Sequence, residues 1–437
     1  MLPRDGRLKA PRLGQRTALI ALICMAVMGC TAASPTPAPS MEPPVSTGPT
    51  SGPSYTSALT FSAAPAATAT PTAALPNFGP LTAGNWASVR WTKVPQSPLS
   101  LPTPADSNSS WQIVGWSRGW VAFIDGETPD DSMAGTSTID TEYSADGVRW
   151  TVGARIKGDA LGGTQLRAVE GPAGLLVYDF EGTMCGWVSN VDTLIATSAD
   201  GITWRSISAS TFGQGSIQNV SGGSAGYIAT GLGGVWTSTD AISWHKAALT
   251  GSAFKGLDGV RDGVAFSGGF VISGETYGPS TDGCGGGPTL LTPSLWWSPD
   301  GKAWTRGQVK GTTSGSQVWM DVMRLDDDRL IASEASGANW ASGDGRSWRK
   351  VPSQNITEQP GQQHLFDGQR TAIVSLSFDQ TPDTIEVLAD DLTLTELKQV
   401  GELPDPDHVL GFTAFGPTGF LRMDDLGNTF IGVPVAS

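Results

Sequence analysis

Acidic side chains follow most of the short apolar segments that recur along this chain. Carboxylates in such positions could bind a cation, an amine or a basic peptide if the segment ends meet at one face of the fold. The candidate acidic rim consists of Asp125, Glu127, Asp179, Glu181, Glu275, Glu334 and Asp424. The alternative is a set of solvated loop ends in an acidic protein, because charge runs usually lie in solvent.

Paired carboxylates can also hydrolyse glycosidic bonds when two of them lie about 5 to 10 Å apart. The residues that could supply such a pair are Asp125, Asp179, Glu181 and Glu275. The sequence does not pair them, so no catalytic residue is assigned. With His245, His364 and His408 as the only histidines, a Cys/His metal cluster is excluded, and we expect neither a metal nor a cofactor.

The N-terminal segment has the pattern of a secretory signal. Residues 1–16 carry five Lys/Arg and one Asp, and the apolar run from Thr17 to Gly29 is too short to span a bilayer. The letters VMGC resemble a bacterial lipobox, which implies cleavage before Cys30 and acylation of that cysteine. Two or more acyl chains hold a protein stably on a membrane. We therefore expect a signal peptide over 1–29 and a lipid-anchored protein on the extracytoplasmic side of a bacterial membrane.

A tether is expected to follow the anchor, over residues 30–81. Residues 31–80 contain 11 prolines and a single charged side chain, Glu42, and such a composition cannot bury enough apolar surface to fold. The net charge of the chain is −14, and it becomes −18 without residues 1–29, because five positive residues and one negative residue are removed. This acidic balance argues against binding to nucleic acid and against docking on an anionic lipid surface.

Two cysteines remain in the expected folded domain, residues 82–437. Cys185 and Cys284 fall in long loops of different repeat units, in a compartment that permits disulfides. A bridge between Cys185 and Cys284 is the candidate disulfide, and two free thiols are the alternative, because spacing alone does not decide between them.

A short box recurs five times at intervals typical of propeller blades. The stretches YSADGVRW, TSADGITW, TSTDAISW, WSPDGKAW and ASGDGRSW share a Ser, an Asp, a Gly or Ala and a Trp. Asp-Gly between strand-prone segments predicts a type I′ hairpin turn, with the Ser and Asp side chains bonded to backbone N–H groups and the Trp packed between hairpins. The structural box residues are Asp146, Gly147, Trp150, Asp200, Gly201, Trp204, Asp240, Trp244, Asp300, Gly301, Trp304, Asp344, Gly345 and Trp348.

Seven apolar runs recur along the chain, and five of them lie upstream of a box. Each run follows a segment that is a weaker candidate for a strand. They begin near residues 119, 174, 226, 269, 329, 370 and 419, which predicts units of four strands. The seventh unit ends the chain one strand short, and the segment 86–95 resembles a strand that follows a box, with Trp91 at the Trp position. We therefore predict an all-β, seven-bladed β-propeller of four-stranded antiparallel blades, closed by the N-terminal strand.

The boxes resemble the Asp-box (BNR) repeats of sialidase-like propellers over most of residues 86–437. The resemblance implies a propeller whose boxes sit at the blade peripheries, away from any catalytic face. A sialidase would also need an Arg-Ile-Pro strand, which is missing from this sequence. We expect a monomeric binding or scaffold protein that takes a protein, peptide or wall glycan at its loop-rich face. The alternatives are a glycoside hydrolase with paired carboxylates and an assembly factor for a membrane complex.

Overall fold

The structure is a computed structural model, in which the chain divides into two compact units, Met1–Ala73 and Ala74–Ser437. It describes residues 86–94, 111–126, 138–157, 165–180, 195–213, 217–231, 234–254, 257, 259–277, 290–311, 320–326, 329–334, 337–351, 362–366, 371–375, 384–388, 394–403, 409–424 and 428–436. All of these lie in the second unit. Cys30, Cys185 and Cys284 lie outside the described residues, so the lipid anchor and the disulfide stay predictions.

In the described part of the chain, the strands form seven sheets. The first comprises β2 (Trp111–Trp116), β3 (Gly119–Gly126), β4 (Thr138–Ser144) and β5 (Thr151–Val152), with β6 (Ile156–Lys157) also paired to β4. The second comprises β7 (Gln165–Gly171), β8 (Gly174–Phe180), β9 (Ile195–Ser198) and β10 (Arg205–Ser206). The third comprises β11 (Ile217–Gly223), β12 (Gly226–Gly231), β13 (Gly234–Ser238) and β14 (His245–Lys246).

The remaining sheets repeat this order, with added strands in two of them. The fourth comprises β15 (Gly259–Phe266), β16 (Gly269–Tyr277), β17 (Leu290–Ser298) and β18 (Thr305–Arg306). The fifth comprises β20 (Met320–Asp326), β21 (Arg329–Glu334), β22 (Asn339–Ser342) and β23 (Ser347–Val351), extended by β19 (Gln308–Val309). The sixth comprises β24 (Gln362–Phe366), β25 (Thr371–Ser375), β26 (Thr384–Leu388) and β27 (Leu394–Glu396). The seventh comprises β29 (Val409–Gly416), β30 (Gly419–Asp424), β31 (Thr429–Ala436) and β1 (Trp86–Lys93), extended by β28 (Lys398–Gly401).

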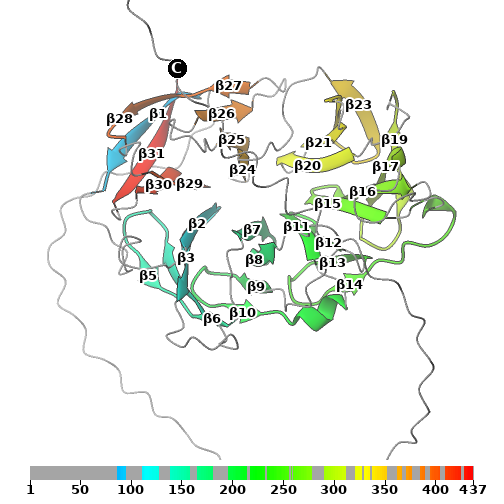
Figure 1. Cartoon of the computed structure of the whole chain (residues 1–437), viewed down its shortest axis with the longest axis horizontal. Helices are drawn as coiled ribbons and strands as arrows, with labels where there is room; N and C mark the ends of the chain where they lie inside the picture. Colours follow the sequence, from blue (N-terminus) through cyan, green and yellow to red (C-terminus); the bar gives the residue numbers. More distant parts are fainter. Residues whose placement is uncertain are drawn as a thin grey trace, which may run out of the picture. The chain divides into compact units, whose positions relative to one another are not determined.

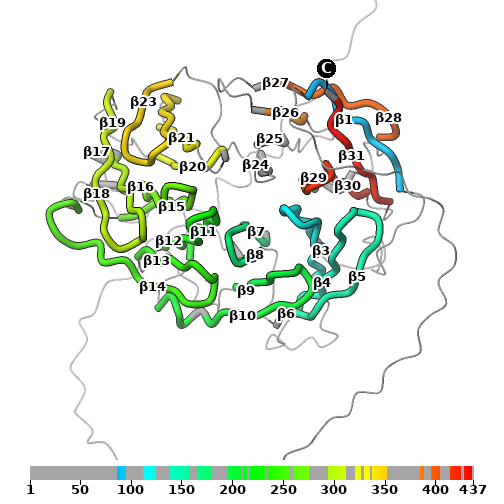
Figure 2. Tube along the Cα trace, turned by 180° about the vertical axis from the view of Figure 1, so that it is seen from behind, coloured from blue at the N-terminus to red at the C-terminus, as the bar shows by residue number. Residues whose placement is uncertain are grey.

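The seven sheets are the blades of a propeller, as the sequence predicted. The first strand of each blade is the innermost one, and Figures 1 and 2 show the blades following one another around these inner strands. Contacts join β29 to β2, β2 to β7, β7 to β11, β11 to β15, β15 to β20, and β24 to β29. Each apolar run that the sequence singled out forms the second strand of its blade.

The N-terminal strand closes the ring. Strand β1 pairs antiparallel with the C-terminal strand β31, and Trp91 lies opposite Gly432. On its other side β1 pairs in parallel with β28, which continues from the outer strand of the sixth blade. The predicted closure is therefore confirmed, and β1 is held by ladders on both edges.

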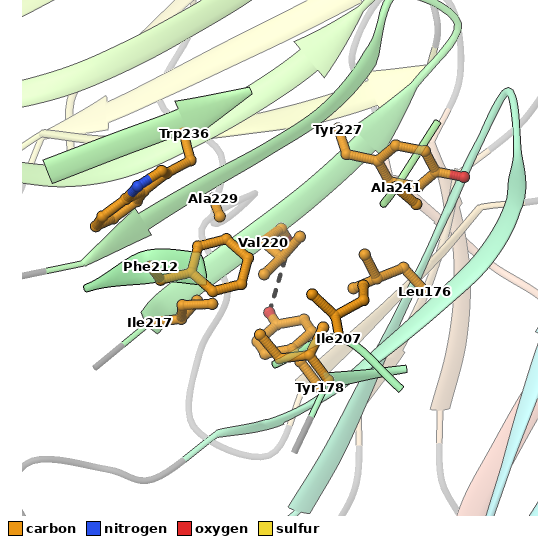
Figure 3. Packing of buried hydrophobic residues seen from close by; sticks show 11 residues of the cluster. Leu176, Tyr178, Ile207, Phe212, Ile217, Val220, Tyr227, Ala229, Trp236 and Ala241 are labelled. Carbon is orange, nitrogen blue, oxygen red and sulfur yellow. Dashed lines mark hydrogen bonds between the residues drawn. The ribbon is translucent and has the colours of Figure 1, made fainter. Parts of the chain in front are cut away.

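Apolar side chains fill the spaces between neighbouring blades. Between the second and third blades, Leu176 and Tyr178 of β8 pack with Val220 of β11 and with Tyr227 of β12 (Figure 3). The Tyr178 hydroxyl lies 3.5 Å from the backbone oxygen of Val220, so this buried phenol keeps a polar partner. Each blade thus depends on its neighbours for its core.

The Asp box connects the third and outermost strands, but its turn is not of type I′. A type I′ turn needs a positive φ at both central residues. In the described parts of the chain, Ala241 is the sole residue other than glycine with a positive φ, so the box aspartates do not have this conformation. The Asp200 Oδ1 accepts the backbone N–H groups of Ile202 and Thr203 at 2.8 and 2.7 Å, and these side-chain bonds shape the turn instead.

The predicted roles of the other box residues are confirmed. The Ser198 Oγ accepts the backbone N–H of Gly201 at 2.8 Å, and the same bond recurs in the boxes of Gly147 and Gly345. The indole N–H groups of Trp304 and Trp348 each donate to the carbonyl of their own box glycine at 3.1 Å, and both rings are buried. The box is a turn clamp with a packing anchor.

Candidate functional site

The predicted acidic rim is described at two of its seven positions. Glu334 and Asp424, at the ends of β21 and β30, are both buried rather than exposed. The Asp424 carboxylate accepts the backbone and side-chain N–H groups of Asn428, each at 2.6 Å, so it stabilises its own loop. At Asp125, Asp179 and Glu275 the structure describes the backbone alone, and Glu127 and Glu181 lie outside the described residues.

A polar network that the sequence analysis did not identify joins three consecutive inner strands. Asn219 lies on β11, Arg261 and Asp262 lie on β15, and Asp321 lies on β20. The Asn219 side-chain N–H₂ donates to Asp262 Oδ1 at 3.1 Å. The Arg261 guanidinium forms an ion pair with Asp321, and the Asp321 carboxylate lies close enough to Asp262 to raise its pKa. These contacts tie the third, fourth and fifth blades together.

The charges of the network are unbalanced. One guanidinium faces two carboxyl groups, so the cluster would carry an excess negative charge if both acids were ionised. Burial raises the pKa of Asp262 well above its usual range, and repulsion from the Asp321 carboxylate adds to this effect, although Arg261 and the Asn219 bond oppose it. The Asp262 carboxyl group is therefore protonated over a range of pH in which aspartates are ordinarily charged.

The network is reachable from solvent. The side chains of Arg261 and Asp321 are 40% and 42% exposed. Toward the other end of the inner strands the backbones approach closely: a Cβ on Gly115 would lie 1.8 Å from the Phe415 oxygen, and one on Gly222 would lie 2.1 Å from the Glu170 oxygen. The polar network therefore lies at the end of the inner strands that is not packed backbone against backbone.

The geometry of this cluster suits binding better than hydrolysis. Asp262 accepts the Asn219 amide and Asp321 is paired with Arg261, so both carboxyl groups are already engaged within the network instead of flanking a glycosidic bond as a hydrolase requires. Among the described residues, no three His, Cys, Asp or Glu side chains are grouped as a metal site would require. The cluster offers a guanidinium, an amide and two acids to a polar ligand.

A local signal for this site is present in the sequence. The strand that contains Arg261 and Asp262 places two charged residues next to each other inside an otherwise apolar inner strand, and Asp321 interrupts the next one. Such residues are rarely found in a fully packed strand. Their convergence could not be foreseen, because it depends on which inner strands become neighbours. No helix long and apolar enough to cross a bilayer was found in the described ranges.

Comparisons with known proteins find likeness in structure alone. No family model matches the chain, and no curated protein sequence matches it. Ycf48 bound to a D1 peptide is similar at a TM-score of 0.40 and 12% identity, over 81% of this chain and 98% of that one. Trypanosoma rangeli sialidase in complex with the inhibitor DANA gives a TM-score of 0.34 and 14% identity over 74% of this chain, which spans 54% of the sialidase. The C-terminal WD40 domain of Sif2 gives 0.34 and 12%, over 82% of this chain and 98% of that domain.

Proposed function

We propose that this chain is a lipid-anchored, extracytoplasmic binding protein whose propeller takes a protein, peptide or wall glycan at the solvent-accessible end of its inner strands. The observation that carries the proposal is the network of Asn219, Arg261, Asp262 and Asp321. It brings donors and acceptors from three blades together, and its Arg261 and Asp321 side chains are accessible to solvent. Binding sites are commonly built where rigid elements converge in this way.

Catalysis is not part of the proposal. A hydrolase needs a proton donor and a second carboxylate separated by the width of a substrate bond or a water. In this network Asp262 accepts the Asn219 amide and Asp321 is paired with Arg261. A bound ligand would exchange hydrogen bonds with the network without bond cleavage.

The lipid anchor is tested by the mass of the mature protein. When the full chain is produced in a bacterial host, we expect a membrane-associated protein that begins at Cys30 and carries acyl chains. The Cys30→Ser variant should lack the acyl mass. Cleavage at another position, or an unmodified Cys30 in a soluble protein, would contradict the anchoring.

Ligand binding is tested on an array of peptides and wall glycan fragments. We expect retention of particular probes without change in their mass, and weaker retention by Asp321→Asn, whose exposed side chain makes it the safer variant for folding. The matched control is Asp140→Asn, because Asp140 also pairs with an arginine, Arg155, but lies on β4. Release of shortened glycans would instead support a hydrolase. Stable co-purification with a membrane complex, with no array signal, would support an assembly factor.

A further inference from the structure

The outermost strands of the second to fifth blades carry basic residues without acidic ones. The described residues on and after these strands are 205–213, 245–254, 305–311 and 347–351, and these ranges contain no Asp or Glu. Their basic residues, which we call the basic band, are Arg205, Lys246, Arg306, Lys310, Arg349 and Lys350. All six are exposed. The band stands out in a chain whose net charge is −14.

Three members of the band occupy equivalent positions on consecutive blades. Lys246 pairs across the strands with Trp236, Arg306 with Trp296, and Lys350 with Trp340. Each cation lies over the ring of its partner, with centroid distances of 5.5, 5.8 and 5.5 Å. The indoles support the aliphatic stems, so the charged groups are held at the outer surface.

The fold itself does not demand a cation at this position. In the first blade, Val152 of β5 pairs with Glu142, and in the second blade, Ser206 of β10 pairs with Ala196. Val152 is 68% exposed, so even an apolar side chain is tolerated there. Protection of an edge strand by charge therefore does not by itself account for the cations of the third to fifth blades.

The box aspartates reduce the charge of these outer strands without cancelling it. Asp200, Asp240, Asp300 and Asp344 precede the strands in the sequence, and they are four acids against the six basic residues of the band. Their carboxylates are turned toward backbone N–H groups of their own turns, as in the bonds from Ile242 and Ser243 to Asp240 at 2.8 and 2.6 Å. Among the described residues of these boxes and outer strands, basic side chains therefore outnumber acidic ones.

We propose that the basic band docks the propeller on anionic phospholipid headgroups of the membrane that carries its anchor. The inference rests on the proposed anchoring, because an anchored domain meets that surface at a high effective concentration. Each basic residue near an anionic surface contributes about 1 kcal/mol, and the attraction decays within a Debye length of about 8 Å. It departs from the expectation from net charge, which averages the band with acids located elsewhere. Docking by the outer strands leaves the inner-strand network clear of the bilayer.

Vesicle co-sedimentation tests the proposal with the unit Ala74–Ser437, which contains every described strand and core cluster. This fragment has no anchor, so binding reports the band alone. We expect it to sediment with vesicles that contain phosphatidylglycerol, to stay in solution with pure phosphatidylcholine vesicles, and to be released by high salt. Equal binding to both vesicle types, or no binding to either, would overturn the proposal.

Matched variants separate the band from the net charge. The triple variant Lys246→Gln, Arg306→Gln, Lys350→Gln should bind the anionic vesicles at least about 10-fold more weakly. The control Arg90→Gln, Lys93→Gln, Lys398→Gln removes the same charge from outer strands of the seventh blade, where Lys93 also lies over an aromatic ring, that of Phe430. We expect the control to change binding less than about 3-fold. A control that loses as much as the band variant would overturn the assignment.

Two further outcomes keep this test independent of the proposed function. Vesicle binding that soluble inorganic polyphosphate abolishes at equal phosphate concentration would point to a soluble polyanion as the partner and would overturn the lipid surface. If vesicle binding fails but the full chain is acylated at Cys30, the docking inference fails and the anchored binding protein stands. If Cys30 is not acylated, the proposed anchoring fails whatever the vesicles show.

Discussion

At the scale of single residues, the side-chain hydrogen bonds of the Asp box could be predicted from the sequence, but the backbone conformation of its turn could not. Ser and Asp side chains beside a glycine have few uses other than capping a turn, so their partners follow from the sequence. The type I′ assignment was wrong because the Asp carboxylate supplies hydrogen bonds that a tight hairpin would otherwise take from its backbone. The glycine alone then needs a positive φ, as in Gly201 with φ 76°.

Substitution of a box glycine tests this geometry. Gly201→Ala is expected to cost about 1–3 kcal/mol, because the left-handed backbone is strained for alanine and the new Cβ would lie 2.5 Å from Tyr143 Cδ2. The third blade already has alanine there, Ala241 with φ 61°, so Ala241→Gly should change stability by less than about 1 kcal/mol. Urea unfolding measures the stability change of both variants. Changes of equal size in Gly201→Ala and Ala241→Gly would contradict the role of the Tyr143 contact.

The raised pKa of Asp262 predicts an unusual pH dependence of stability. Its raised pKa in the folded state means that this group favours folding at low pH and that the benefit is lost as pH rises through the folded pKa. Asp262→Asn mimics the protonated acid, so the variant should gain thermal stability relative to the parent as pH rises from about 4. A stability difference between Asp262→Asn and the parent that is constant with pH would refute the raised pKa, and Asp140→Asn serves as the control for loss of a carboxylate elsewhere.

At the scale of elements, strand identity was predictable and strand partnership was only partly so. The apolar second strands are long, buried and punctuated by glycine, as in β12, where every residue is buried. The short parallel additions β19 and β28 were not foreseen, because each pairs with a neighbouring blade rather than with its own. The local sequence pattern does not specify which strand of another blade becomes a partner. For the same reason, the convergence of Asp262 and Asp321 could not be predicted.

The closing strand β1 should be a stability determinant. Trp91 is 1% exposed, its indole N–H donates to Gln399 Oε1 at 3.2 Å, and the Arg422 guanidinium lies 4.6 Å from its ring centroid. Trp91→Ala is expected to cost about 3–5 kcal/mol. The exposed Val152→Ala should change stability by less than about 0.5 kcal/mol. Denaturant midpoints of the two variants measure these stability changes. A small stability loss in Trp91→Ala would mean that the ring does not depend on this closure.

At the scale of the whole molecule, the box aspartates make the propeller sensitive to acid. Hydrogen bonds lower the pKa of each described box aspartate, and for Asp200 they outweigh burial, which acts in the opposite direction, to reach about 2. A lowered folded pKa gives stability that is present above about 3.9 and lost as pH falls through the folded value. Each contribution is small, since these carboxylates are largely exposed.

Acid unfolding followed by tryptophan fluorescence measures their combined effect. We expect stability to fall steeply below about pH 4 and the slope to become shallower in Asp200→Asn, which cannot be protonated. The Asp140→Asn variant removes a carboxylate outside the boxes and serves as the reference. An unchanged slope in Asp200→Asn would show that acid acts elsewhere.

The pairing of β1 with both β28 and β31 also determines when folding of the propeller can be completed. A ribosome or a secretion channel delivers a chain from its N-terminus, so β1 emerges before any other described strand, whereas β28 and β31 are among the last to follow. Until β28 and β31 have emerged, both edges of β1 are unpaired and can form non-native strand pairs, as unpaired strands generally can. The first strand to emerge is thus paired only by strands that emerge last. A nascent chain that stops within its final blade would leave the edges of β1 and of its last completed strand unpaired.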